Sequence, residues 1–301
     1  INVELKGGAV KEFENGTTPA EIAKSIGAGL YKSVCCAKVD GDLCDLRTPL
    51  EKDCKVELLT FDNVDGQKTF WHTASHVLAQ AVKRLYPNAK CAIGPAVDNG
   101  FYYDFDVEKP FSPEDLEKIK AEMKKIVKSG LELERVELSP EEAEKKLEEM
   151  NEPYKVELVK EHSDKGEHIT FYKQGEFIDL CAGPHLMSVA PIKAIELTAC
   201  TGAYWRGDAN NAQLCRVYGV AFPKASMLEE HLKKLEEAKL RDHNKLGREL
   251  EYFTTVDYVG QGLPIILPKG SRVIQTLQRW VEDVEQKHGY LLTKTPFMAK
   301  R

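Results

Sequence analysis

The stretch WHTASHVLAQAVKRL, Trp71–Leu85, has the clearest helical periodicity in the chain and guides the interpretation of the rest. Its apolar residues recur at the spacing of an amphipathic helix, and Pro87-Asn88 ends the pattern. His72 and His76 are four residues apart within it. Because residues i and i+4 lie on one face of a helix, the two imidazoles can converge on a single point.

A second group of reactive side chains lies far downstream, in the segment DLCAGPH, 179–185. Cys181 and His185 are again four residues apart. Together with His72 and His76, they offer the donor number and the ligand types of a tetrahedral zinc site. The sequence therefore predicts that these four side chains meet.

The chemistry of that cluster has two interpretations. A zinc peptidase of the HExxH type needs a glutamate directly after its first histidine, and this chain has Thr73 there, so peptidase chemistry lacks its base. Either the four residues bind zinc and lower the pKa of a bound water, or they hold and deprotonate a water directly. The spacing does not separate the two, and it does not say which histidine is the base.

Several other polar residues stand in apolar surroundings, and each has a structural alternative. Asp179 can be a turn or cap residue, Lys155 a solvated surface lysine, and Tyr103 a core aromatic. The segment TGAYWRGD, 201–208, combines glycines, aromatics and an arginine. That combination suits the stacking and phosphate pairing of a nucleotide end, or else a glycine-rich turn with buried aromatics.

Composition restricts the class of protein. At 301 residues the chain exceeds one hydrophobic core, and 42% hydrophobic with 30% charged residues suits a soluble globular protein. No apolar run approaches the roughly 18 residues of a membrane helix. The formal net charge of −6 means that an RNA partner would need local basic patches. The eight cysteines include no CxxC and no paired framework, which favours a reducing, cytoplasmic location.

The pattern predicts an α+β protein of several domains. Residues 1–61 read as short strands around one helix that opens at Thr18-Pro19, with Asp40-Gly41 as a hairpin turn, which is the pattern of a ubiquitin-like β-grasp. Residues 62–224 read as a second α+β domain, entered through a polar linker at Asp62–Lys68. Within it, Ser112 and Ser139 are predicted to cap two helices.

The last part of the chain is predicted to be a long charged helix followed by the start of another domain. Residues 225–250 read as one spacer helix with balanced charges, stiffened by i,i+4 pairs, with contact to an acidic partner as the alternative. Residues 251–301 are predicted to hold a helix at Ser271–His288 and a strand at Tyr290–Lys294. Because the chain begins at Ile1 and ends soon after an apolar run, we expect a piece of a longer protein.

Four segments closely resemble the editing domain of bacterial threonyl-tRNA synthetases. They are HTASH (72–76), AIGPAVDNGFYYDF (92–105), FIDLCAGPH (177–185) and TGAYWRGD (201–208). The HxxxH and CxxxH halves are shared with alanyl-tRNA synthetase editing domains, and the other two segments are more characteristic of the threonyl enzyme. Residues 1–61 resemble the TGS module, 225–250 the linker helix, and 251–301 the start of the class II antiparallel-sheet catalytic domain, truncated in motif 1 at Pro296.

The resemblance implies roles for the matching residues. The family's editing pocket is lined by the residues that match His72, His76, Cys181 and His185. The residues matching Lys155, Asp179 and Tyr103 help to hold the amino acid and the water. Three more residues of the resembling segments are taken as substrate-binding candidates: Gly94, Tyr204 and Arg206.

The implied function is hydrolytic proofreading within threonine–tRNA ligase. Serine is threonine without one methyl, and a pocket distinguishes the two by only about 1–3 kcal/mol, so a second site that hydrolyses seryl-tRNA(Thr) is needed. We expect His72 or His76 to place a water on the ester carbonyl, Lys155 to stabilise negative charge, and Asp179 to bind the ammonium group. The expected partner is the acceptor end of tRNA(Thr) carrying serine.

The resemblance also bears on cofactors and assembly. Editing is expected to need no cofactor, although the four candidate ligands make zinc possible. ATP binding and the ligase's own zinc belong to catalytic-domain residues beyond this chain, so no aminoacylation is expected from it. The parent family forms homodimers. Two other functions stay open here: a zinc-dependent free-standing aminoacyl-ester hydrolase, and a non-catalytic RNA-binding or regulatory module.

Overall fold

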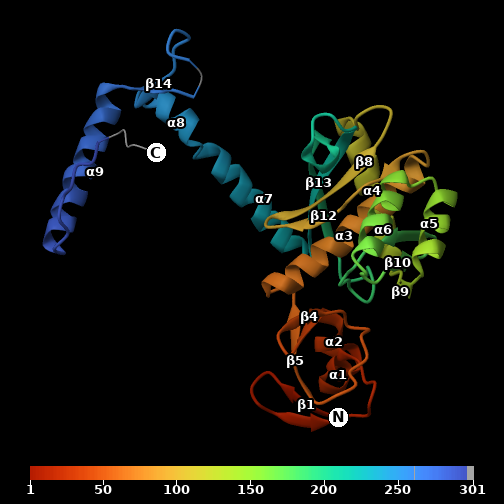
Figure 1. Cartoon of the computed structure of the whole chain (residues 1–301). Coiled ribbons are helices and arrows are strands. Elements are labelled where there is room, and N and C mark those ends of the chain that lie inside the picture. The colour runs from red at the N-terminus through yellow and green to blue at the C-terminus, as the bar shows by residue number, and fades with distance from the viewer. Residues whose placement is uncertain (261, 297–301) are drawn as a thin grey trace. The chain divides into compact units, whose positions relative to one another are not determined.

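The protein is described here by a computed structural model that covers residues 1–260 and 262–296 (Figure 1). The chain divides into two compact units, Ile1–Glu229 and Glu230–Arg301. The first unit contains a small N-terminal domain and a larger domain built around one long helix. Among the described helices, none combines the length and the apolar character that crossing a membrane requires.

The N-terminal domain is a five-stranded mixed sheet with two short helices. Its strands are β1 (Asn2–Leu5), β2 (Val10–Glu12), β3 (Val34–Val39), β4 (Asp42–Cys44) and β5 (Cys54–Thr60), and its helices are α1 (Pro19–Ile26) and α2 (Ala28–Ser33). The strand order is β2-β1-β5-β3-β4, with β1 and β5 parallel. Ile22 of α1 packs into the core against this sheet. The predicted β-grasp architecture is confirmed.

The helix-capping and turn residues of this domain have the structures that the sequence predicted. Thr18 caps α1 in a reciprocal box with Glu21, and Pro19 occupies the first turn, where its missing N–H costs nothing. Asp40 and Gly41 both have positive φ, 53° and 99°, as a tight two-residue hairpin requires. The helix α2 was not predicted.

The long helix α3 runs from Val64 to Leu85. The predicted linker at Asp62–Lys68 is therefore wrong, because most of it is the first turn and a half of this helix. Asp65 lies in the first turn of the helix, where the positive end of the helix dipole stabilises its negative charge. Composition alone does not distinguish such a polar first turn from a loop. Gly66 lies against the backbone of Thr60, where a Cβ would overlap the carbonyl oxygen.

Two sheets and four helices make up the larger domain. The first sheet has the order β12-β13-β8-β6, with β7 paired to β8, and the second has the order β11-β10-β9. The elements are β6 (Lys90–Cys91), β7 (Ala96–Val97), β8 (Gly100–Asp106), α4 (Pro113–Ser129), β9 (Leu133–Glu137), α5 (Pro140–Glu149), α6 (Pro153–Asp164), β10 (Thr170–Gln174), β11 (Phe177–Leu180), β12 (Ala194–Tyr204), the short 3-10 helix η1 (Trp205–Gly207) and β13 (Gln213–Phe222).

The core of this domain lies between α3, α4 and the first sheet. Leu78 of α3 and Met123 of α4 are fully buried there with Phe105 of β8. Ser112 and Ser139 cap α4 and α5, as predicted. The helix α6 was not predicted, and it supplies Lys155. Its apolar pattern is too weak to detect, since only Lys155 and Val159 are buried along it.

Two predictions for the second unit and the helix that leads into it are wrong. The single helix expected over 225–250 is instead α7 (Ala225–Leu240) and α8 (His243–Glu249). Asp242 separates them, because its side chain accepts a hydrogen bond from the backbone N–H of Lys245 and so begins a new helix. The expected i,i+4 ion pairs do occur in α7 and just after it, between Lys234 and Glu230 and between Arg241 and Glu237.

The remaining elements of this unit are β14 (Phe253–Thr254), β15 (Ile265–Ile266) and α9 (Pro268–Lys287). Helix α9 begins three residues before the predicted Ser271. The strand predicted at Tyr290–Lys294 does not form, since no described strand pairs with it and a strand needs a partner. Pro296 is the last described residue of the motif 1 segment, and 297–301 lie outside the described part.

Candidate active site

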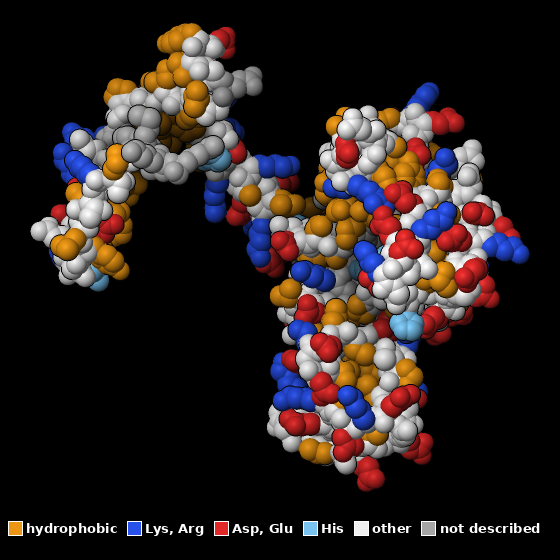
Figure 2. Space-filling view, in the orientation of Figure 1, with side chains coloured by type: hydrophobic (Ala, Val, Ile, Leu, Met, Phe, Trp, Pro, Cys, Tyr) orange, Lys and Arg blue, Asp and Glu red, His pale blue; other side chains and the backbone are white. Residues whose placement is uncertain are grey.

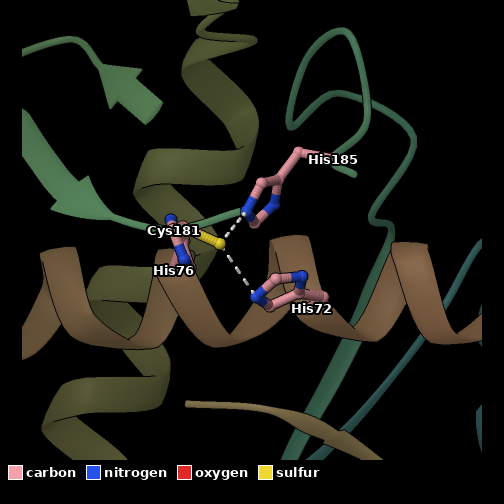
Figure 3. Close-up of side chains that lie close together, drawn as sticks. All are labelled: His72, His76, Cys181 and His185. Carbon is pink, nitrogen blue, oxygen red and sulfur yellow. Dashed lines mark hydrogen bonds between the residues drawn. The ribbon is translucent and has the colours of Figure 1, made fainter. Parts of the chain in front are cut away.

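The four predicted side chains meet at one point (Figure 3). His72 and His76 project from α3, and Cys181 and His185 lie on the segment that follows β11. The Sγ of Cys181 lies 3.2 Å from the Nε2 of His72 and 3.2 Å from the Nε2 of His185. The four potential ligand atoms are all within 4.8 Å of one another.

Burial lowers the pKa of two of these histidines. His76 and His185 are buried, and His72 and Cys181 are half-buried. Burial lowers the pKa of His72 to about 4, although Asp179 opposes the shift. Burial and the neighbouring imidazoles hold the pKa of His185 well below its ordinary value. At neutral pH both rings therefore carry a free nitrogen lone pair.

The tautomer of His185 follows from its partners. The Oγ1 of Thr73 donates its one proton to the carbonyl of Thr69, 3.0 Å away, and accepts the N–H of Leu186 at 3.0 Å. The Nδ1 of His185 lies 3.2 Å from the same oxygen and must be the donor, because the hydroxyl has no second proton. The Nε2 of His185 is therefore the unprotonated nitrogen, and it faces Cys181.

His72 is arranged in the same way. Its ring is hydrogen-bonded to the backbone of Pro184, and its Nε2 faces Cys181. One thiol proton is thus shared between two imidazole nitrogens. The Nδ1 of His76 is buried without any hydrogen-bond partner. A surplus of lone pairs over protons suits a soft divalent cation, so the four side chains fit zinc by the chemistry of their donors.

Three side chains from separate elements form a second group beside the histidines. The Nζ of Lys155, in the first turn of α6, lies 2.7 Å from the Oδ1 of Asp179 in β11. The hydroxyl of Tyr103, in β8, donates to the Oδ2 of Asp179 at 2.5 Å. That oxygen is also 3.6 Å from the Nε2 of His76. Asp179 therefore links Lys155 to the histidine cluster.

The charges of this group are mutually stabilised. Burial alone would raise the pKa of Asp179, but Lys155 and His76 more than offset it and the pKa is lowered. Burial alone would lower the pKa of Lys155, and the Asp179 carboxylate reverses that shift. Burial and Asp179 hold the pKa of Tyr103 well above its ordinary value, so its hydroxyl keeps the proton that it donates. At neutral pH the group contains an ammonium beside a carboxylate.

Members of both groups line one cavity of about 370 Å³, whereas His185 and Tyr103 lie behind its wall. His72, Cys181 and Lys155 contribute to its wall, and so does Gly94. A Cβ at Gly94 would overlap the ring of Tyr103, so only glycine lets this wall approach the strand so closely. The hydroxyl of Ser75 lies 2.6 Å from the Gly94 carbonyl and fixes the loop to α3.

Two candidates from the sequence lie away from this cavity. Tyr204 ends β12 and is 45% exposed, and Arg206 follows in η1. The guanidinium of Arg206 forms ion pairs with Glu157, at 2.8 Å, and with Glu161, both on α6. It is therefore already occupied by carboxylates. On the face shown in Figure 2, acidic and basic side chains are intermixed over residues 1–229.

No sequence pattern pointed to several residues that support the site. Thr73 orients His185, and Tyr172 packs beside it with ring centroids 4.4 Å apart. Asp45, from the N-terminal domain, accepts a hydrogen bond from the backbone N–H of His185. Thr73 stands next to His72 in the motif, where its type indicates only that the glutamate of a zinc peptidase is missing. A contact from another domain has no local sequence pattern that could reveal it.

Residues 1–60 match the TGS domain family. Residues 169–218 match the family described as the threonyl and alanyl tRNA synthetase second additional domain, which includes Cys181 and His185.

The chain is also similar throughout to curated threonine–tRNA ligases. It is 58% identical over 300 residues to that of Clostridium perfringens, a match that covers 100% of this chain and 46% of the relative. It is 53% identical over 298 residues to that of Acetivibrio thermocellus, covering 99% of this chain and 47% of the relative. The chain thus spans less than half the length of these relatives. Because the match covers the whole of this chain, it does not favour a free-standing hydrolase. Along its entire length the chain is therefore similar to the N-terminal portion of threonine–tRNA ligases, and it contains matches to the TGS domain and to the second additional domain of threonyl and alanyl tRNA synthetases.

Proposed function

We propose that this part of the protein hydrolyses the ester of seryl-tRNA(Thr). The observation that carries the proposal is that His72, Cys181 and the buried Lys155–Asp179 pair line one cavity, with His185 beside Cys181. General bases and a fixed positive charge are the two things that ester hydrolysis by water requires. The similarity to threonine–tRNA ligases along the whole chain supports the same assignment.

The reaction can be written with its protons. Water attacks the ester carbonyl carbon, and its proton passes to an imidazole nitrogen. The C–O bond to the terminal ribose then breaks, and the ribose oxygen takes the proton, which leaves free serine and uncharged tRNA. We assign the base to His72, because it is half-buried at the cavity wall and its ring is neutral at pH 7. Its lowered pKa, about 4, makes it a weaker base than an ordinary histidine.

Lys155 supplies the positive charge. Its ammonium lines the cavity, and Asp179 keeps it protonated by raising its pKa against the effect of burial. A fixed cation in a dry site stabilises the negative charge that develops on the carbonyl oxygen more strongly than water does. The two oxygens of Asp179 already contact Lys155 and Tyr103. Binding of the substrate ammonium to Asp179 would therefore replace one of these contacts, and we assign Asp179 mainly an orienting role.

Zinc fits the same residues. His72, His76, Cys181 and His185 would hold it, and a bound zinc ion would supply a Lewis acid. The reaction above uses only side chains of the chain itself, because His72 and Lys155 together provide a base and a cation.

The physical need for such a site is discrimination between serine and threonine. A pocket made for threonine rejects the analogue with one methyl fewer by only about 1–3 kcal/mol. A second pocket can instead exclude the larger amino acid by its extra methyl. We propose that threonine is spared here because its methyl displaces the attacking water.

The test is deacylation of seryl-tRNA(Thr) and threonyl-tRNA(Thr), measured side by side with the same preparation. We expect rapid release of serine and slow release of threonine. The variant His72→Ala should lose about 10²–10⁴-fold in kcat. His243→Ala, on α8 in the other unit, is the matched control and should retain full activity. Equal rates for wild type and His72→Ala would refute the assignment of the base, and no release of serine by wild type would refute the function.

A further inference from the structure

A loop of the N-terminal domain reaches the catalytic segment of the next domain. Asp45 and Arg47 follow β4, and they contact residues 185–186, directly beside the ring that faces Cys181. Both residues belong to the same compact unit as the cavity. The roles proposed above for the histidines and Lys155 do not use them.

Asp45 holds the backbone of His185. Its side chain is 7% exposed, and its Oδ2 accepts the N–H of His185 at 3.2 Å and the hydroxyl of Tyr172 at 2.8 Å. Burial and the Asp45 carboxylate raise the pKa of Tyr172 far above its ordinary value, so this hydroxyl remains a donor. Asp45 therefore holds His185 in two ways. It binds the backbone N–H directly, and it orients Tyr172, whose ring packs on the His185 ring.

Arg47 holds a carbonyl of the same segment and a carbonyl of β9. Its Nη2 donates to the carbonyl of Leu186 at 2.7 Å, and its Nε donates to the carbonyl of Leu133 at 3.0 Å. Its Nη1 donates to Asp45 at 3.0 Å, which orients both side chains. A planar guanidinium with several fixed donors sets the positions of its acceptors more tightly than a single flexible ammonium would.

Apolar contacts also hold the N-terminal domain against the larger domain. Met187, two residues after His185, packs on the hydrophobic core of the N-terminal domain. In the other direction, Cys35 and Phe61 of the N-terminal domain are buried in the core that contains α3. Since interiors pack densely, these shared core contacts restrict movement between the two domains around the contact.

The position of the backbone at residues 185–186 sets the orientation of the His185 ring. Thr73 accepts both the Nδ1–H of His185 and the N–H of Leu186 on one oxygen. A shift of residues 185–186 therefore alters the orientation of the imidazole that faces Cys181. A displacement of about 1 Å at a catalytic group can cost roughly 100-fold in rate.

We propose that Asp45 and Arg47 are positioning residues for His185, so that docking of the N-terminal domain completes the hydrolytic pocket. This inference rests on the proposed function for its kinetic consequence. The positional claim itself concerns only the ring of His185 and its neighbour Cys181, and it can be measured without any substrate.

The first experiment is kinetic and uses the full chain. Asp45→Asn keeps the size of the side chain but removes its charge, and Arg47→Lys keeps the charge but removes the planar fork. We expect each to lower kcat for seryl-tRNA(Thr) by about tenfold or more, with KM changed by less than about twofold. Lys38→Gln is the matched control, because Lys38 forms an ion pair with Asp65 across the same domain junction, at 2.6 Å, without touching residues 185–187.

The second experiment measures the alkylation of Cys181 by iodoacetamide, followed by peptide mass spectrometry. Because His185 packs on the thiol, its displacement in Asp45→Asn and Arg47→Lys should change the rate of alkylation about threefold or more, and Lys38→Gln should not. If wild type does not release serine, the proposed function fails and the alkylation rates still decide the positional claim. If wild type is active and Asp45→Asn and Arg47→Lys match Lys38→Gln in both kcat and alkylation, the positional claim is overturned and the proposed function stands.

Discussion

The ammonium of Lys155 lies 2.7 Å from the carboxylate of Asp179, and the two side chains are only 5% and 4% exposed. The pair joins α6 to β11 at the edge of the cavity. Taking two charges out of water is costly, and their mutual attraction together with further hydrogen bonds offsets that cost. Here the hydroxyl of Tyr103 supplies one such hydrogen bond.

Removing one member of this pair should therefore destabilise the fold. We expect Lys155→Met to lower the free energy of unfolding by about 3–5 kcal/mol, because it leaves the Asp179 carboxylate buried without its cation. The double variant Lys155→Met/Asp179→Leu should recover most of that loss and should remain inactive. Urea denaturation measures the stability, and deacylation measures the activity. A double variant that is as unstable as the single one would contradict the explanation.

The orientation of His185 by Thr73 gives a second prediction. Thr73→Val keeps the shape of the side chain but leaves the His185 Nδ1–H and the Leu186 N–H without their acceptor. We expect a loss of about 1–3 kcal/mol per unsatisfied group and a lower kcat. Thr73→Ser keeps the hydroxyl and should retain kcat. Equal kcat values for the two variants would show that the hydroxyl does not orient the ring.

The lowered pKa of His72 predicts how stability depends on pH. Between about pH 4 and 6.5 the unfolded chain binds a proton at this residue and the native protein does not. The free energy of unfolding should therefore rise with pH across this window, and the contribution of His72 should be lost as the pH falls from about 6.5 through 4. Denaturant titrations at several pH values measure the slope. In His72→Gln the slope should be smaller, and an unchanged slope would count against the buried neutral imidazole.

The same shift bears on the pH dependence of the reaction. A base with a pKa of about 4 stays unprotonated through the range where an ordinary histidine gains its proton. We expect the acid limb of kcat/KM for seryl-tRNA(Thr) to lie well below pH 6.5. A limb centred near 6.5 would instead indicate an imidazole in contact with solvent.

Zinc gives the last prediction. Because the proposed reaction uses the lone pair of His72, we expect a chelator to leave deacylation by wild type unchanged. Added zinc should bind to the four candidate ligands and inhibit, since it would occupy that lone pair. Cys181→Ser should weaken the inhibition. Stoichiometric zinc in protein purified without metal affinity, with activity lost on chelation, would reverse the assignment.

The sequence by itself determined the local structure near strong signals. Thr18, Ser112 and Ser139 begin their helices where the capping pattern places them, because a cap acts within four residues. The spacing of His72 and His76 was sufficient to place both imidazoles on one face of a helix. The weakly amphipathic α6 and the break at Asp242 gave no comparable pattern.

Only the tertiary structure decided the contents of the site. The meeting of α3 with the segment 181–185 depends on packing between elements more than 100 residues apart, for which no local spacing exists. The pairing of Lys155 with Asp179, the surplus of lone pairs around Cys181, and the approach of Asp45 to His185 all follow from that packing. The physical reason is that helix periodicity and caps act over a few residues, whereas burial, pKa shifts and contacts between domains arise only when distant parts of the chain exclude water together.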